Sequence, residues 1–123
     1  MRQFFILVFA FVLGGCNSVK DIGGTYHLIS DNPSFQRVTL EIDGTRVSGQ
    51  GPCNRYFGSI LQSDIGSSSI LVGPLASTKM ACPHLSAEQR YFQELQRASM
   101  VEVVPNRLIL TTSDETKLVF KYR

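Results

Sequence analysis

The chain has 123 residues, of which 43% are hydrophobic and 18% are charged, and its formal net charge is +2. That length allows one domain and excludes an enzyme with separate cofactor and substrate domains. The net charge is too small for an electrostatic nucleic-acid binder, so we expect no nucleic-acid partner. High apolar content at low net charge also argues against intrinsic disorder.

The N-terminal residues are predicted to direct export and to stay outside the fold. Residues 4–13 form an unbroken apolar run, about half of the ~20 residues that span a bilayer as a helix. Residues 13–16, Leu-Gly-Gly-Cys, then resemble the lipobox of bacterial lipoproteins, in which lipid is attached to the Cys thiol and the signal is cut before it. We therefore predict a lipoprotein signal peptide at 1–15 and acylation, palmitate included, of Cys16. An ordinary secretory peptide with an incidental Cys16 is the alternative.

Residues 16–22 are predicted to form a lipidated tether, followed by the domain at 23–123. Six extended residues reach about 20 Å, so the domain is expected close to the bilayer. More than one acyl chain on Cys16 would anchor it stably. At the position after the Cys an Asp resembles an inner-membrane retention signal, whereas this chain has Asn17. We therefore expect a lipid-anchored protein of the bacterial cell envelope, at the outer membrane and facing the periplasm.

Most of the domain has the pattern of short strands. Residues 38–42 alternate apolar and polar with a period of two, as a half-buried strand does. Asp43-Gly44 follows and is a strong hairpin signal. Similar patterns between turn residues predict further strands. The predicted strands are 25–29, 38–42, 45–49, 59–61, 70–72, 101–104, 107–112 and 118–122.

One segment has helical spacing instead. Residues 86–89, Ser-Ala-Glu-Gln, match a capping box, and apolar residues then recur every three to four positions through about Met100. The predicted helix face consists of Phe92, Leu95 and Ser99, with Tyr91 and Ala98 beside them. The expected fold class is α+β: a curled antiparallel sheet, or partly open β-barrel, with one helix packed against it.

Two short motifs carry a family resemblance. Residues 51–58, Gly-Pro-Cys-Asn-Arg-Tyr-Phe-Gly, and residues 77–82, Ser-Thr-Lys-Met-Ala-Cys, resemble the paired signatures of the META domain, the HslJ-like family of bacterial envelope proteins. The resemblance spans about Gly23 to Arg123 and departs from the family pattern at Pro52 and Phe57. It implies an envelope lipoprotein linked to stress resistance, drug tolerance, or secretion and motility. It implies no catalytic residue, so none is assigned.

Two cysteines remain once Cys16 is assigned to lipid. Cys53 and Cys82 can form one disulfide, and an oxidising periplasm favours that pairing. The alternative is a metal site that uses both thiolates with His84. Cys-x-His spacing crowds a tetrahedral site and no fourth ligand is evident, so we expect the disulfide, no metal and no cofactor.

The residues after Cys53 are the candidate recognition surface. Asn54, Arg55 and Tyr56 stand beside the predicted disulfide, where they could contact a partner. Alternatively Asn54 caps a turn and Tyr56 packs in the core. No serine lies in a Gly-x-Ser-x-Gly elbow with a His and Asp arranged to activate it, and His27 is expected to be a half-buried strand residue.

Three functions remain open on the sequence. The first is a non-catalytic envelope protein, held at the membrane by its lipid anchor, that binds or stabilises another envelope protein. The second is a module that binds a small apolar molecule or lipid, with an architecture like that of secretion pilot lipoproteins. The third, an enzyme acting on envelope polymers, has no titratable pair at a spacing that chemistry requires, so we expect no enzyme.

Overall fold

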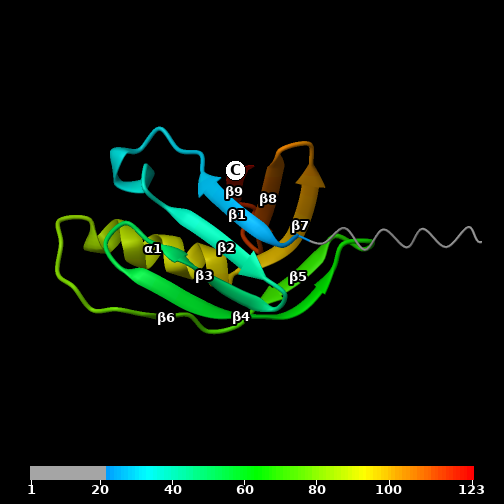
Figure 1. Cartoon of the computed structure of the whole chain (residues 1–123), viewed down its shortest axis with the longest axis horizontal. Helices are drawn as coiled ribbons and strands as arrows, with labels where there is room; N and C mark the ends of the chain where they lie inside the picture. Colours follow the sequence, from blue (N-terminus) through cyan, green and yellow to red (C-terminus); the bar gives the residue numbers. More distant parts are fainter. Residues whose placement is uncertain (1–21) are drawn as a thin grey trace, which may run out of the picture.

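The computed structural model describes residues 22–123, so the predicted signal peptide, Cys16 and the tether up to residue 21 lie outside the described residues. Strands dominate the rest of the chain (Figure 1). In chain order the elements are β1 (Gly24–Leu28), a short 3-10 helix (Pro33–Phe35), β2 (Thr39–Asp43), β3 (Arg46–Gln50), β4 (Arg55–Asp64), β5 (Ser69–Val72), β6 (Ala76–Ser77), α1 (Leu85–Gln96), β7 (Ala98–Val104), β8 (Arg107–Thr112) and β9 (Lys117–Tyr122).

The strands form a closed antiparallel barrel. Their order is β3-β2-β1-β9-β8-β7-β5-β4, and β4 pairs back onto β3, which closes the ring at eight strands. The short strand β6 pairs with the first part of β4, on the edge opposite β3, at Tyr56–Ser77 and Phe57–Ala76. The predicted fold class, an antiparallel sheet curled into a barrel with one helix against it, is confirmed, and the β3–β4 ladder makes the closure complete.

Alternation along the strands fills the barrel. Leu108 and Leu110 on β8 point inward and are fully buried, as is Phe120 on β9, while the residues between them are more exposed. At the β2–β3 turn Gly44 has φ of 60°, a conformation that glycine adopts without strain. The hairpin predicted at Asp43-Gly44 forms with Asp43 paired to Arg46.

The helix α1 lies across one end of the barrel (Figure 1). The hydroxyl of Tyr91 on α1 contacts that of Tyr56 at the start of β4, and Tyr56 donates to the Thr39 carbonyl at the start of β2. Just after α1, the Arg97 carbonyl accepts from the backbone N–H of Ser113, just after β8. The helix therefore closes the rim where β8 ends and where β2 and β4 begin.

The described chain begins at the other rim. Ile22 precedes β1, which starts at the end opposite α1 (Figure 1). Ile22 is buried, and its carbonyl accepts a 2.7 Å hydrogen bond from the Tyr26 hydroxyl. Packing of the domain thus includes Ile22, which lies one residue before the predicted boundary.

The helix differs from its prediction at both ends. It begins at Leu85 with His84 as N-cap and no side-chain capping bond, so the capping box predicted at 86–89 does not form. It ends at Gln96 because β7 starts at Ala98, which leaves Ser99 on a strand. Its deepest apolar residues are Tyr91 and Leu95, both fully buried, whereas Phe92 is half-buried.

Candidate functional site

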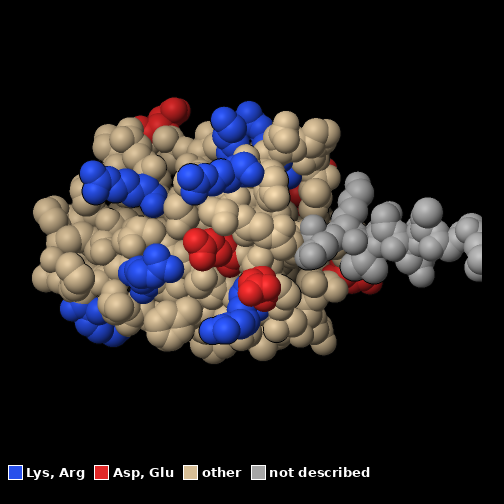
Figure 2. Space-filling view, viewed as in Figure 1, with Lys and Arg blue, Asp and Glu red and all other residues tan. Residues whose placement is uncertain are grey.

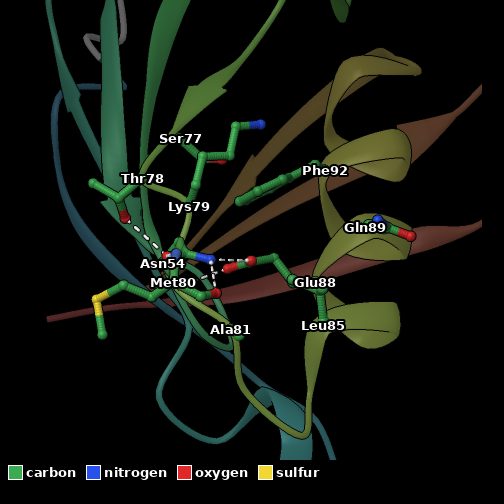
Figure 3. A pocket seen from close by; sticks show the side chains of 10 residues that line it. All are labelled: Asn54, Ser77, Thr78, Lys79, Met80, Ala81, Leu85, Glu88, Gln89 and Phe92. Atoms are coloured by element: carbon green, nitrogen blue, oxygen red, sulfur yellow. Dashed lines mark hydrogen bonds between the residues drawn. The ribbon is translucent and has the colours of Figure 1, made fainter.

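A cleft of about 340 Å³ lies between α1 and the segment 77–81 that follows β6. Glu88 and Phe92 point into it from the helix, and the Met80 side chain points away (Figure 3). Lys79 and Leu85 stand at its mouth and are exposed. The residues that line the cleft are Asn54, Ser77, Thr78, Lys79, Met80, Ala81, Leu85, Glu88, Gln89 and Phe92.

Asn54 fixes the segment 77–81 against the barrel. Its Oδ1 accepts from the Thr78 hydroxyl at 3.0 Å and from the backbone N–H of Met80 at 2.7 Å. Its Nδ2 donates to the Met80 carbonyl at 3.2 Å. The side chain is 2% exposed, so these bonds replace all of its contact with water. Asn54 therefore acts as a buried clamp within the domain.

Glu88 completes this network from the first turn of α1. Its Oε1 accepts from the backbone N–H groups of Cys53 at 3.0 Å and Asn54 at 2.6 Å. Its Oε2 accepts from Nδ2 of Asn54 at 2.7 Å. Glu88 is only 2% exposed, and a buried carboxylate is tolerated when several N–H donors satisfy it. The positive end of the helix dipole adds to that stabilisation.

Gly51 leaves the space that the carboxylate occupies. A Cβ at this position would lie 2.7 Å from Oε1 of Glu88 and 3.0 Å from the Asn54 carbonyl. The backbone N–H of Gly51 donates to the same Asn54 carbonyl at 2.7 Å, and this bond closes the turn from residue 51 to residue 54. The glycine that opens the first motif is therefore required by the close approach of Glu88.

Two buried tyrosines support the cleft from inside the barrel. Tyr56 gives its one hydroxyl proton to the Thr39 carbonyl at 2.6 Å, so Tyr91 must be the donor in the 2.8 Å contact between the two hydroxyls. Burial raises the pKa of both hydroxyls well above the ordinary value of 10.0. Phe92 packs against both rings, with centroids 5.4 Å from Tyr56 and 5.9 Å from Tyr91.

A disulfide joins Cys53 to Cys82, with their Cα atoms 6.0 Å apart. It ties the turn that carries Asn54 to the segment that leads into α1. Both sulfurs are engaged in this bond, so the alternative site with His84 has no thiolates to offer. Within residues 22–123, no group of three or more His, Cys, Asp or Glu side chains is placed to hold a metal ion.

The structure separates the three predicted recognition residues. Asn54 and Tyr56 are buried, whereas Arg55 is exposed at the start of β4. The exposed groups at the cleft are instead Lys79 and Leu85, which the sequence analysis did not single out. It also missed Glu88, whose position in the first turn of a helix indicated only a favourable dipole interaction.

One serine has a histidine partner that the sequence did not indicate. The Ser34 hydroxyl and Nδ1 of His84 are 3.0 Å apart, beside an open cleft of about 420 Å³. His84 is exposed and Ser34 is half-buried, and no carboxylate in the described part of the chain accepts a hydrogen bond from this imidazole. His27 is exposed on β1 and not half-buried as expected.

No α-helix among residues 22–123 is long and apolar enough to cross a membrane.

Comparison with known families identifies the domain. The model of the META domain matches residues 18–123, which include both motifs, the barrel and the helix. The chain belongs to the META domain family. The META family suggests an envelope-related module. No curated protein matches the sequence significantly.

Solved structures share the fold of this META domain. An NMR structure of a protein from Burkholderia xenovorans matches with a TM-score of 0.63 at 23% identity, covering 81% of each chain. The crystal structure of a DUF4847 family protein from Bacteroides vulgatus ATCC 8482 matches with a TM-score of 0.66 at 12% identity, covering 82% of this chain and 93% of that one. These identities are low, so the likeness concerns the fold alone.

Proposed function

We propose that this META-domain protein is a non-catalytic envelope lipoprotein, anchored through Cys16, whose cleft at residues 77–81 and α1 binds another envelope protein. The observation that carries this proposal is the position of the cleft. It lies beside the helix that closes one rim of the barrel, whereas the described chain starts at Ile22 on the opposite rim. Anchored by residues 16–22, the domain would present the cleft away from the bilayer.

The chemistry of the cleft supports a protein partner. Phe92 and Leu85 offer apolar surface, and the exposed Lys79 offers a cation at the mouth. Such a cleft suits a segment with an apolar side chain beside a carboxylate. The buried Asn54–Glu88 network and the disulfide hold both walls in place, so little conformational entropy is lost when a partner binds.

The buried carboxylate of the cleft has a structural role in this proposal. Both Glu88 oxygens already accept hydrogen bonds from Cys53 and Asn54, so they are committed to holding the two walls together. A general acid or base needs instead a proton-transfer partner within reach in the cleft.

We place the protein among modules that maintain the envelope under stress or drug exposure, the role that the family resemblance implies.

A small apolar molecule is the second candidate for the same cleft. Its volume of about 340 Å³ falls at the lower end of the range of small-molecule sites. The barrel interior is filled by buried side chains such as Tyr56, Tyr91 and Phe120, so a ligand would bind outside the barrel. Native mass spectrometry of protein purified from membranes tests this, and titrations with lipids that stay flat would contradict it.

The anchor is tested by Cys16→Ser in the full chain. The substitution should abolish lipidation and move the protein out of the membrane fraction without changing the near-UV circular dichroism of the domain. Inhibition of the lipoprotein signal peptidase should likewise block processing. Unchanged processing under that inhibitor would contradict the lipoprotein assignment.

Binding is tested by chemical cross-linking in cells. Leu85→Glu and Lys79→Glu should each remove the neighbour that wild type captures, because they change the apolar surface and the cation at the mouth of the cleft. Leu71→Glu is the matched control, since Leu71 is equally exposed on the wall of β5. A wild type with no neighbour above that of an unrelated lipoprotein would contradict the proposal.

A further inference from the structure

The outer face of β1, β9 and β8 carries a row of basic side chains that the cleft does not involve. Lys121 pairs with Arg107 on one side and with His27 on the other, and all three are exposed. Directly opposed residues on neighbouring strands point to the same side of a sheet. Arg123 follows two residues after Lys121, and its backbone N–H donates to the Thr25 carbonyl, so the row continues across the start of β1.

These cations have no acidic partner in the described part of the chain. The ion pair found among residues 22–123 joins Arg97 to Asp114, on the rim with the helix. Glu41 on β2 and Glu102 on β7 lie at the two margins of the face. Figure 2 shows Lys and Arg side chains over the upper part of this view, where β1 and β9 lie in Figure 1. Others lie lower on the same view, near Asp and Glu side chains.

The face also lies at the rim where the described chain begins. Arg107 begins β8 and Tyr122 ends β9, both opposite α1 and on the same rim as Ile22. Tyr122 is 47% exposed, and its ring packs edge-on against Tyr26 with centroids 5.5 Å apart. A tyrosine with an apolar body and a polar tip is a favourable side chain at a membrane surface.

We infer that the outer face formed by Arg107, Lys121 and Arg123 docks on anionic phospholipid headgroups of the membrane that holds the protein, with Tyr122, which points to the inner side with Tyr26, at the rim beside it. This inference rests on the proposed anchor at Cys16, because a tether of about 20 Å keeps this rim near the bilayer. Asp43 ends β2 and Asp64 ends β4 on the other side of the same rim. Anionic lipid would repel these two carboxylates, so the domain would tilt with β8 and β9 toward the membrane. Once the anchor is inserted, the tether holds this face at a high effective concentration near the lipid headgroups. A weak affinity of the face for the headgroups is then enough to keep it docked.

The test uses vesicle co-sedimentation at low ionic strength with a chain that begins at Asn17. This chain contains all of residues 22–123, and therefore the closed barrel and its core. It should bind vesicles in which phosphatidylcholine is mixed with an equal part of phosphatidylglycerol, and should not bind pure phosphatidylcholine. Added salt should release it.

A triple variant, Arg107→Gln with Lys121→Gln and Arg123→Gln, should lower the partition coefficient about a hundredfold, or about fivefold per charge. The matched control removes three exposed cations near the rim with the helix, Arg37→Gln with Arg90→Gln and Lys117→Gln, and should lose less than about fivefold in total. Both variants should have the melting temperature of wild type, because every replaced side chain is exposed.

Three results with vesicles would overturn the inference: equal losses in both triple variants, equal binding of wild type to pure phosphatidylcholine, or no binding of wild type to the anionic vesicles. Binding of a DNA duplex as tight as that of the vesicles would also overturn it, by identifying a general polyanion surface. In the lipidated full chain the first triple variant should stay in the membrane fraction. Failure of the docking face is thereby distinguished from failure of the anchor.

Discussion

Asn54 and Glu88 are joined twice across the wall of the cleft. The Glu88 carboxylate accepts the backbone N–H of Asn54 on Oε1 at 2.6 Å and its side-chain amide on Oε2 at 2.7 Å. Asn54 in turn clamps the segment at Thr78 and Met80. One pair of side chains thus connects the start of α1, the turn at residues 51–54 and the segment after β6.

Glu88→Gln should destabilise the domain by about 2–3 kcal/mol. Glutamine replaces one acceptor oxygen by an NH₂ group, which must face either the Asn54 amide or the backbone N–H groups of Cys53 and Asn54. Either orientation brings two donors together in a buried site. Chemical denaturation measures the loss, and hydrogen exchange should show faster exchange at the Cys53 and Asn54 amides.

Glu102→Gln provides the control for that substitution. Glu102 is exposed on β7, so the same loss of charge should change stability by no more than about 0.5 kcal/mol. Equal unfolding curves for Glu88→Gln and wild type would show that the network does not hold the cleft.

Gly51→Ala should destabilise the domain by about 1–3 kcal/mol, as overpacking of a tight site does. The added methyl group would lie 2.7 Å from Oε1 of Glu88, and the carboxylate cannot move without losing its donors. Gly66→Ala is the comparison, because a Cβ there approaches only the end of the Asp64 side chain, at 3.3 Å. That change should stay within about 1 kcal/mol of wild type, and thermal melts that rank the two substitutions in the opposite order would contradict the assignment.

Reduction of the Cys53–Cys82 disulfide should lower stability by about 3–4 kcal/mol in the chain-entropy model, because the bond closes a loop of 29 residues. The barrel should still fold, since its core does not depend on the bond. Cys53→Ser, Cys82→Ser and the double substitution should melt at similar, lowered temperatures. Free thiols in peptide maps of non-reduced protein, or a wild-type melt that reductant leaves unchanged, would be incompatible with this role.

The tyrosine pair predicts how stability depends on alkaline pH. Burial holds the pKa values of Tyr56 and Tyr91 above 10.0 in the folded protein, so both keep their protons there while the unfolded chain loses them. Their contribution to stability is therefore complete below pH 10 and is lost as the pH rises above it.

Tyr91→Phe should make the alkaline decline of the unfolding free energy shallower by about 1.4 kcal/mol per pH unit. It should also lower stability at neutral pH by about 1 kcal/mol, because it removes the hydrogen bond donated to Tyr56. Urea titrations at a series of pH values measure both effects. Parallel declines in wild type and variant above pH 10 would mean that Tyr91 ionises in the folded state.

Local patterns predicted the barrel strands well and the helix boundaries poorly. Residues 107–112 alternate cleanly, and the strand there has the predicted bounds. The helix end was misplaced because Ala98 and Ser99 follow Leu95 at intervals of three and four, which mimics a helix face although both belong to β7. A Ser-Ala-Glu-Gln sequence resembles a helix start even where the helix already began at Leu85.

The candidate site was only half visible in the sequence. The two motifs indicated the walls of the cleft, because the predicted disulfide between their cysteines joins the turn at residues 51–54 to the segment before α1. The partner of Asn54 lies 34 residues away on another element, and no local pattern connects a carboxylate in the first helical turn to a distant backbone N–H. A core position for Tyr56 was one of the two alternatives, but its partner Tyr91 lies 35 residues away, and no local pattern connects the two.

The most direct test of the proposed function places a photoreactive amino acid at Leu85 in the full, lipidated chain. Illumination of living cells should give a discrete cross-linked product from this position, because Leu85 stands at the mouth of the cleft. The same amino acid at Leu71, on the wall of β5, should give none. Products that are equal at both positions, or absent at Leu85, would contradict the assignment of the cleft as the binding site.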